Sequence, residues 1–119
     1  MQSIDFFKNK LELLFEIVEK INTPVFITDA AILKQKVNSI QKAFNENCLL
    51  FYAIKANFNP AIINVLKEAG INGIETISPF EINLAKKLGF DNNQILFTGN
   101  NCDANELEQA RNSGVIVNL

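Results

Sequence analysis

The residues best suited to chemistry are a lysine and several polar side chains that each follow a short apolar segment. Lys55 comes directly after the apolar run Leu49–Ile54, where partial burial would disfavour its ammonium form. A neutral lysine amine can condense with an aldehyde, so Lys55 suits a Schiff base. The alternative is a lysine that merely extends from a strand end into solvent, and the residues alone leave both readings open.

Two carboxylates follow in the next apolar segment. A carboxylate at Glu75 or Glu81 near Lys55 could balance its charge or move a proton. Glu81 has a competing role, because Ser78-x-x-Glu81 with Pro79 in the first turn forms a capping box that satisfies free backbone N–H groups. From the residues alone, the capping role is favoured for Glu81.

A third polar stretch is Phe97-Thr98-Gly99-Asn100-Asn101. Gly99 would let the backbone approach another group closely, and the two amides after it offer hydrogen bonds. A plain loop before a helix capped by Asp103 explains the stretch equally well. Asp103-x-x-Glu106 indicates a helix start rather than a metal site.

Short alternating elements must position these residues. Strands are predicted at Leu49–Ile54, Gly73–Ile77, Gln94–Thr98 and Val115–Val117. The helices between them are predicted to begin at Asn59-Pro60, Ser78-Pro79 and Asp103, and to end at Gly70, Gly89 and Gly114. This pattern, with a period of roughly 20 to 24 residues, predicts a parallel sheet with right-handed crossovers. It fits either an open doubly wound sheet or part of a (β/α)8 barrel, and a whole barrel takes ~250 residues.

Further elements precede this pattern. A leading amphipathic helix is predicted from about Ile4 to Lys20, and Asn22-Thr23-Pro24 ends it. Val25 to Thr28 is predicted as a short strand, followed by a helix that Asp29 caps. The inner face of that helix is predicted to be Leu33, Val37, Ile40 and Phe44. The expected organisation is a leading helix over residues 1–22 and a partial barrel over 23–119, whose alternating pattern is interrupted after its last strand.

Composition excludes several functional classes. The net charge of -2 gives no electrostatic reason to expect nucleic acid or an anionic membrane surface as a partner. The chain has no histidine, so it cannot build a histidine zinc site or a histidine triad, and we expect no metal. Cys48 and Cys102 fit neither a disulfide framework nor a metal motif, and the N-terminus lacks the order of a signal peptide. A cytoplasmic, reducing compartment is therefore expected.

Taken in order, four stretches resemble the diaminopimelate/ornithine/arginine decarboxylases, which share an alanine-racemase-like barrel. Thr23-Pro24-Val25-Phe26-Ile27-Thr28-Asp29 resembles the opening strand of that family, and Phe51-Tyr52-Ala53-Ile54-Lys55-Ala56-Asn57 its cofactor-lysine motif. Glu75-Thr76-Ile77-Ser78-Pro79-Phe80-Glu81 is similar to its Asp-x-x-Ser-x-x-Glu segment, and Ile95-Leu96-Phe97-Thr98-Gly99-Asn100-Asn101 to its glycine-asparagine loop. The resemblance runs from about Asn22 to the C-terminus and is closest to the diaminopimelate branch.

The resemblance implies a (β/α)8 decarboxylase that depends on pyridoxal phosphate, with the cofactor held by Lys55. Glu75 would take the position of the acid close to the lysine and the cofactor, and Glu81 that of a second acid. Ser78 and Asn100 would also belong to the cofactor site. The implied substrate is a basic or diamino acid such as diaminopimelate, in lysine biosynthesis, and the full-length parent would be a homodimer.

Two departures from the family pattern bear on the substrate. Glu75 stands where the family usually has Asp, and Phe80 where it often has Gly, so contacts near the pocket could differ. The resemblance also implies that the phosphate-binding loop, the acid that pairs with the pyridine nitrogen and a β-domain come later, so we expect these 119 residues alone not to decarboxylate. The alternatives are a non-catalytic protein that binds pyridoxal phosphate, and a truncated product without function. Among enzymes, ornithine, lysine or arginine could replace diaminopimelate.

Overall fold

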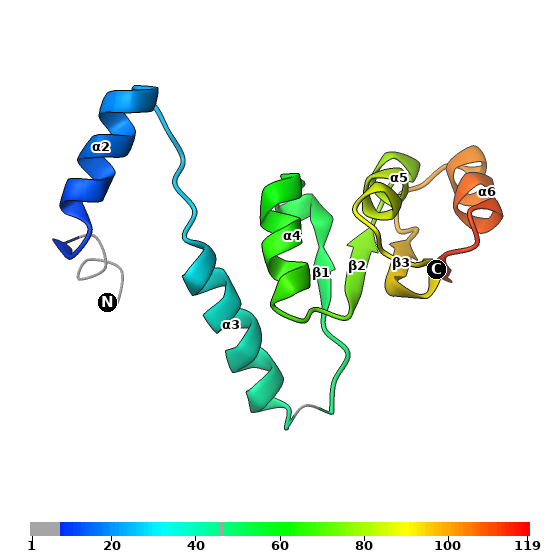
Figure 1. Cartoon of the computed structure of the whole chain (residues 1–119). Helices are drawn as coiled ribbons and strands as arrows, with labels where there is room; N and C mark the ends of the chain where they lie inside the picture. The colour runs from blue at the N-terminus through cyan, green and yellow to red at the C-terminus, as the bar shows by residue number, and fades with distance from the viewer. Residues whose placement is uncertain (1–7, 46) are drawn as a thin grey trace.

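The computed structural model describes residues 8–45 and 47–119 (Figure 1). Its elements in chain order are α2 (Leu11–Ile21), α3 (Ala30–Ala43), β1 (Phe51–Ala53), the 3-10 turn η1 (Ile54–Ala56), α4 (Pro60–Glu68), β2 (Gly73–Thr76), α5 (Pro79–Lys87), the 3-10 turn η2 (Asn92–Gln94), β3 (Ile95–Thr98), α6 (Ala104–Asn112) and β4 (Ile116–Asn118). The predicted alternation of strand and helix is confirmed from β1 onward. Across the described part of the chain, every helix is too short or too polar to cross a bilayer.

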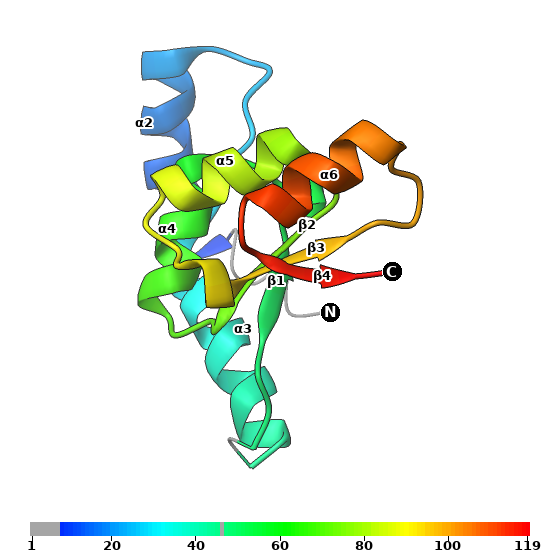
Figure 2. The same ribbon diagram turned by 90° about the vertical axis from the view of Figure 1, so that its right-hand side faces the viewer.

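The four strands form one parallel sheet in which spatial neighbours follow chain order. The register pairs Ala53 with Glu75, Thr76 with Phe97, and Thr98 with Asn118. Connections between adjacent parallel strands are right-handed, so helices that follow one another in this order cover the same face of the sheet. Figure 2 shows α5 and α6 together on one side of the strands. A doubly wound sheet carries helices on both faces, so the barrel-type arrangement is the one that this topology matches.

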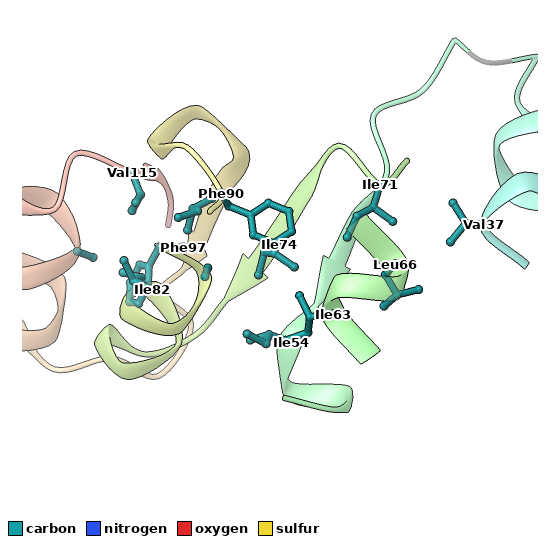
Figure 3. Close-up of a cluster of buried hydrophobic side chains, with 13 residues drawn as sticks. Val37, Ile54, Ile63, Leu66, Ile71, Ile74, Ile82, Phe90, Phe97 and Val115 are labelled. Atoms are coloured by element: carbon teal, nitrogen blue, oxygen red, sulfur yellow. The ribbon is translucent and has the colours of Figure 1, made fainter. Parts of the chain in front are cut away.

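The hydrophobic core lies between the sheet and these helices (Figure 3). The strand residues that face the helices are fully buried: Ile74, Thr76, Ile95 and Phe97. Glu75 and Leu96, which alternate with them, are only half-buried. One face of the sheet is therefore covered and the other is open within the described residues.

This difference between the faces corrects one prediction. The run Leu49–Ile54 was predicted to be a strand covered on both faces, but β1 contains only Phe51–Ala53, and all three residues are half-buried. Leu49 is exposed and Ile54 begins the 3-10 turn. In the described residues the helices shield one face alone, so an apolar run does not guarantee two-sided burial.

The helix boundaries follow the predicted capping residues. The Asp29 carboxylate accepts the N–H groups of Ala31 and Ile32, at 2.8 and 3.1 Å. Asn59 caps α4, Ser78 caps α5, and Asp103 forms a reciprocal capping box with Glu106 at α6. Gly70, Gly89 and Gly114 follow the ends of α4, α5 and α6 with φ of 95°, 77° and 76°, the left-handed conformation that glycine adopts readily.

The C-terminal ends of α4, α5 and α6 each receive a donor from the preceding helix. Gln41 Nε2 donates to Gly70 O at 2.8 Å, Lys67 Nζ to Leu88 O at 2.9 Å and Gly89 O at 2.7 Å, and Lys86 Nζ to Ser113 O at 2.6 Å. Carbonyl groups at a helix C-terminus lack intrahelical partners and carry partial negative charge. These contacts therefore join each βα unit to the next.

The N-terminal part differs from its prediction in two respects. Of the helix predicted from Ile4 to Lys20, the described residues contain α2, preceded by a turn at Asn9 and Lys10, and positions 4–7 lie outside them. None of the residues in α2 is buried. The predicted strand Val25–Thr28 does not form, because no neighbouring strand in the described chain offers it hydrogen bonds.

The inner face predicted for α3 is correct only in part. Val37 is buried and Leu33 is half-buried, whereas Ile40 and Phe44 are exposed. The helix packs against α4, and its C-terminal end extends past the end of α4 (Figure 1). Amphipathic spacing therefore identified the helix but not how much of its apolar stripe is covered.

Candidate functional site

The polar residues singled out in the sequence lie along one edge of the sheet, because β1, β2 and β3 are parallel and all end there. Lys55 lies in η1, directly after β1. Ser78 and Glu81 lie at the start of α5, after β2, and Asn100 follows β3. In parallel α/β folds this carboxyl edge is where ligands bind.

Lys55 is exposed, whereas its neighbour Ile54 is fully buried. In Figure 3 the Ile54 side chain lies beside Ile63 of α4, within the helix layer. The Lys55 side chain makes no hydrogen bond or ion pair with any other residue of the described chain. The predicted partial burial of Lys55 is therefore wrong for this structure, because the apolar run places Ile54 in the core and the next side chain in solvent.

Glu75 lies in β2 on the open face of the sheet. It pairs in register with Ala53, two residues before Lys55, and its side chain is half-buried. Neither Glu75 nor Glu81 forms an ion pair with Lys55 among residues 8–45 and 47–119. The topology therefore places Glu75 next to the strand that carries Lys55, without a direct contact between the two charges.

Glu81 acts as a capping residue in this structure, as its sequence context favoured. Its Oε2 accepts the N–H of Ile77 at 2.7 Å, and the Glu81 N–H donates to Ser78 Oγ at 3.3 Å. The capping box differs from the predicted one by a residue, since Ile77 rather than Ser78 donates to the carboxylate. Phe80, in the first turn of α5, is exposed beside this cap.

The loop after β3 explains Gly99 without a ligand. The Gly99 N–H donates to Asn118 O at 3.0 Å, and its carbonyl accepts the Cys102 thiol at 3.3 Å. A Cβ at this position would lie 3.1 Å from both Cys102 Sγ and Leu119 Cδ2. The close approach predicted for Gly99 is thus made by the chain itself, while Asn100 is exposed.

Tyr52 was not among the residues predicted for the site. Its hydroxyl donates to the carbonyl of Asn57 at 3.2 Å, so the bond crosses the turn that contains Lys55. Burial raises the pKa of the Tyr52 phenol above its ordinary value. The signal in the sequence was a tyrosine within an apolar strand, because a partly buried hydroxyl needs a partner.

Comparison with known proteins identifies the family. The family model described as "Pyridoxal-dependent decarboxylase, pyridoxal binding domain" matches residues 30–119. The diaminopimelate decarboxylase of Methanothermobacter thermautotrophicus is 37% identical over 107 residues, which cover 87% of this chain and 25% of that protein. The enzyme of the same name from Archaeoglobus fulgidus is 37% identical over 100 residues, with 84% and 23% covered. The chain spans about a quarter of the length of these curated relatives.

Solved structures agree with this match. The structure of Helicobacter pylori diaminopimelate decarboxylase complexed with L-lysine superimposes with a TM-score of 0.75 at 30% identity, covering 89% of this chain and 28% of that one. Lysine/ornithine decarboxylase from Vibrio vulnificus complexed with cadaverine gives a TM-score of 0.81 at 20% identity, over 93% and 31% of the two chains, and this likeness shows the fold alone. The chain therefore belongs to the pyridoxal-dependent decarboxylases, within their pyridoxal-binding domain, and the cofactor of this family is pyridoxal phosphate.

Proposed function

We propose that this chain supplies the N-terminal, lysine-bearing part of the active site of a diaminopimelate decarboxylase, and that Lys55 holds the cofactor. The observation that carries the proposal is an exposed amine, without a partner in the described chain, at the carboxyl edge of a parallel sheet. The two relatives at 37% identity named above are diaminopimelate decarboxylases. L-lysine, present in the H. pylori structure, is diaminopimelate without one carboxyl group.

The residues at this edge fit a pyridoxal group. The amine of Lys55 is open to an aldehyde, and the half-buried carboxylate of Glu75 lies on the neighbouring strand. Ser78 Oγ accepts the Glu81 N–H, which leaves its own O–H free to donate to a ligand. The exposed amide of Asn100 can both donate and accept.

Each of these residues has a definite role in the proposal. When bound, pyridoxal phosphate supplies the electron sink for the carbanion left as carbon dioxide departs. Lys55 holds the cofactor through its amine, and Glu75 offers a carboxylate that can balance charge or hold a proton beside it. Glu81 keeps the N-terminus of α5 in place and thereby orients Ser78, while Asn100 offers hydrogen bonds at the next strand end.

The cofactor assignment is tested by chemical trapping on the whole 119-residue chain. The chain is incubated with pyridoxal phosphate and reduced with borohydride, and the labelled lysine is located by peptide mass spectrometry. We expect the label on Lys55 in preference to other lysines, and its loss in K55R. K87R is the matched control, because Lys87 is exposed but lies in the last turn of α5, away from the carboxyl edge. Preferential labelling of another lysine, or no labelling, contradicts the assignment.

Activity is tested separately. We expect the 119-residue chain, supplied with pyridoxal phosphate, to release no carbon dioxide from diaminopimelate. Turnover by this chain would show that no further residues are needed. In the enzyme that carries this chain, carbon dioxide release should be fastest from diaminopimelate. Faster release from ornithine, lysine or arginine would reassign the substrate, and binding of the cofactor without any turnover would favour a non-catalytic protein.

A further inference from the structure

Lys55 is carried by a segment with few interactions of its own. The turn η1 contains three residues and has no side-chain cap at its N-terminal residue, Ala53. A 3-10 segment this short has weaker hydrogen-bond geometry than an α-helix. Because the Lys55 side chain is exposed, packing does not fix it either. The position of its amine therefore depends on what holds the two ends of the turn.

The two ends of the turn are held in different ways. The first end is held by burial, since Ile54 is fully buried beside Ile63 (Figure 3). The second end is held by the hydroxyl of Tyr52, which reaches from β1 across the turn to the carbonyl of Asn57 at 3.2 Å. We propose that Tyr52 is a positioning residue whose hydroxyl holds the turn that carries Lys55. Its importance for the reaction rests on the proposed function of Lys55.

The hydrogen bond from Tyr52 continues into the next helix. Asn57 Oδ1 accepts the N–H of Asn59 at 3.0 Å, and Asn59 Oδ1 accepts the N–H of Ala61 at 2.9 Å. Ala61 lies in the first turn of α4, a helix anchored in the core by Ile63 and Leu66. The backbone that carries Lys55 is thus tied to the half-buried strand β1 on one side and to the core-anchored helix α4 on the other.

Tyr52 is suited to this role over a wide pH range. Burial raises the pKa of its phenol above the ordinary value of 10.0, so the hydroxyl keeps the proton that it donates to Asn57. The ring also packs against the core cluster, and a purely structural role is the alternative to positioning. Phenylalanine at this position keeps the ring and removes only the hydroxyl, so Y52F separates the two roles.

The experiment compares the whole chain with its Y52F variant by two measurements. Amide hydrogen exchange is followed in peptides that cover residues 54–59, and borohydride trapping of pyridoxal phosphate is quantified at Lys55 relative to the exposed Lys36 and Lys87. We expect faster exchange in the turn and a fall of about threefold to tenfold in relative labelling at Lys55, which corresponds to the loss of one hydrogen bond. Thermal unfolding should shift little, because the ring remains.

The control and the outcomes separate the two proposals. S39A removes a hydroxyl that donates to Gln35 O at 2.8 Å in α3, and it should change neither measurement. Unchanged hydrogen exchange in Y52F overturns the positioning role. If the original chain labels at Lys55, equal labelling of Lys55 in Y52F overturns it as well. If the unmodified chain does not label at Lys55, the proposed function fails instead. The role of Tyr52 is then decided by exchange alone: faster exchange supports it, and unchanged exchange overturns it.

Discussion

Replacing Lys67 by methionine is the sharpest test of how neighbouring βα units are held together. The ammonium group of Lys67, on α4, donates to Leu88 O at 2.9 Å and Gly89 O at 2.7 Å, and it lies 4.7 Å from the centre of the Phe90 ring. Methionine retains an unbranched apolar side chain of similar length but removes the charge and all three interactions. The substitution therefore isolates the contribution of the ammonium group to the end of α5.

The magnitude follows from the contacts and from their partial exposure. Hydrogen bonds to charged groups contribute about 1.5–3 kcal/mol each, and a cation–π contact whose cation is partly exposed adds about 0.5–1 kcal/mol. These values do not add, because one ammonium group makes all the contacts. Lys67 is also only half-buried, so water can reach the carbonyl groups that it leaves. We expect the free energy of unfolding to fall by about 1–2 kcal/mol.

Urea unfolding monitored by circular dichroism measures this loss as a lower midpoint with an unchanged slope. The matched control is R111M. Arg111 occupies the equivalent position in α6, two residues before the C-cap, and its guanidinium group makes no hydrogen bond or ion pair within the described part of the chain. R111M should change the stability by less than about 0.5 kcal/mol. If K67M and R111M lose the same stability, the contact with the end of α5 does not stabilise the fold.

Three further predictions concern other parts of the chain. G73A should destabilise by about 1–3 kcal/mol in thermal or urea unfolding, because a Cβ there would lie closer than 3.0 Å to the backbone oxygen of Gln94; unchanged stability would contradict this. S78A should cost about 1 kcal/mol by the loss of the α5 cap, and an unaltered midpoint would show that the cap contributes nothing. The hydrogen bond from Lys10, followed by those from helix N–H groups, lowers the pKa of Asp29 below 3.8. The stabilisation of the fold by the Asp29 carboxylate is therefore present above pH 3.8 and is lost as the pH falls through the lowered pKa. D29N keeps an N-cap but should remove this dependence, and identical acid titrations of helicity for both chains would refute it.

The parts of the fold that could be predicted from the sequence depend on local signals. Asn59-Pro60 fixes the start of α4 because a side-chain acceptor and a preset φ act within one turn. Gly70, Gly89 and Gly114 end their helices because glycine, which has no Cβ, adopts the left-handed conformation without steric cost. Such signals need no knowledge of distant neighbours, so the order of strands and helices from residue 49 onward follows from them.

The predictions that failed depend on contacts distant in the sequence. Val25 to Thr28 has strand composition, but a strand exists only where a neighbour completes its hydrogen bonds. Lys55 follows an apolar run, yet its exposure is decided by which elements cover that end of the sheet. The same limit applies to Tyr52, whose partner became visible only when the turn between β1 and α4 was placed.

The register of β1 against β2 links the stability of the sheet to the chemistry at its edge. Leu50 and Asn72 exchange two hydrogen bonds, Leu50 N–H to Asn72 Oδ1 at 2.7 Å and Asn72 N–H to Leu50 O at 2.8 Å, immediately before the first ladder pair. A shift of one residue would turn Glu75 into the helix-covered core and expose Ile74 in its place. Burying an unpaired carboxylate costs several kcal/mol, roughly the scale of the total stability of a small domain. The core therefore selects the register, and the register places the Glu75 carboxylate on the open face, one strand away from the turn that carries Lys55.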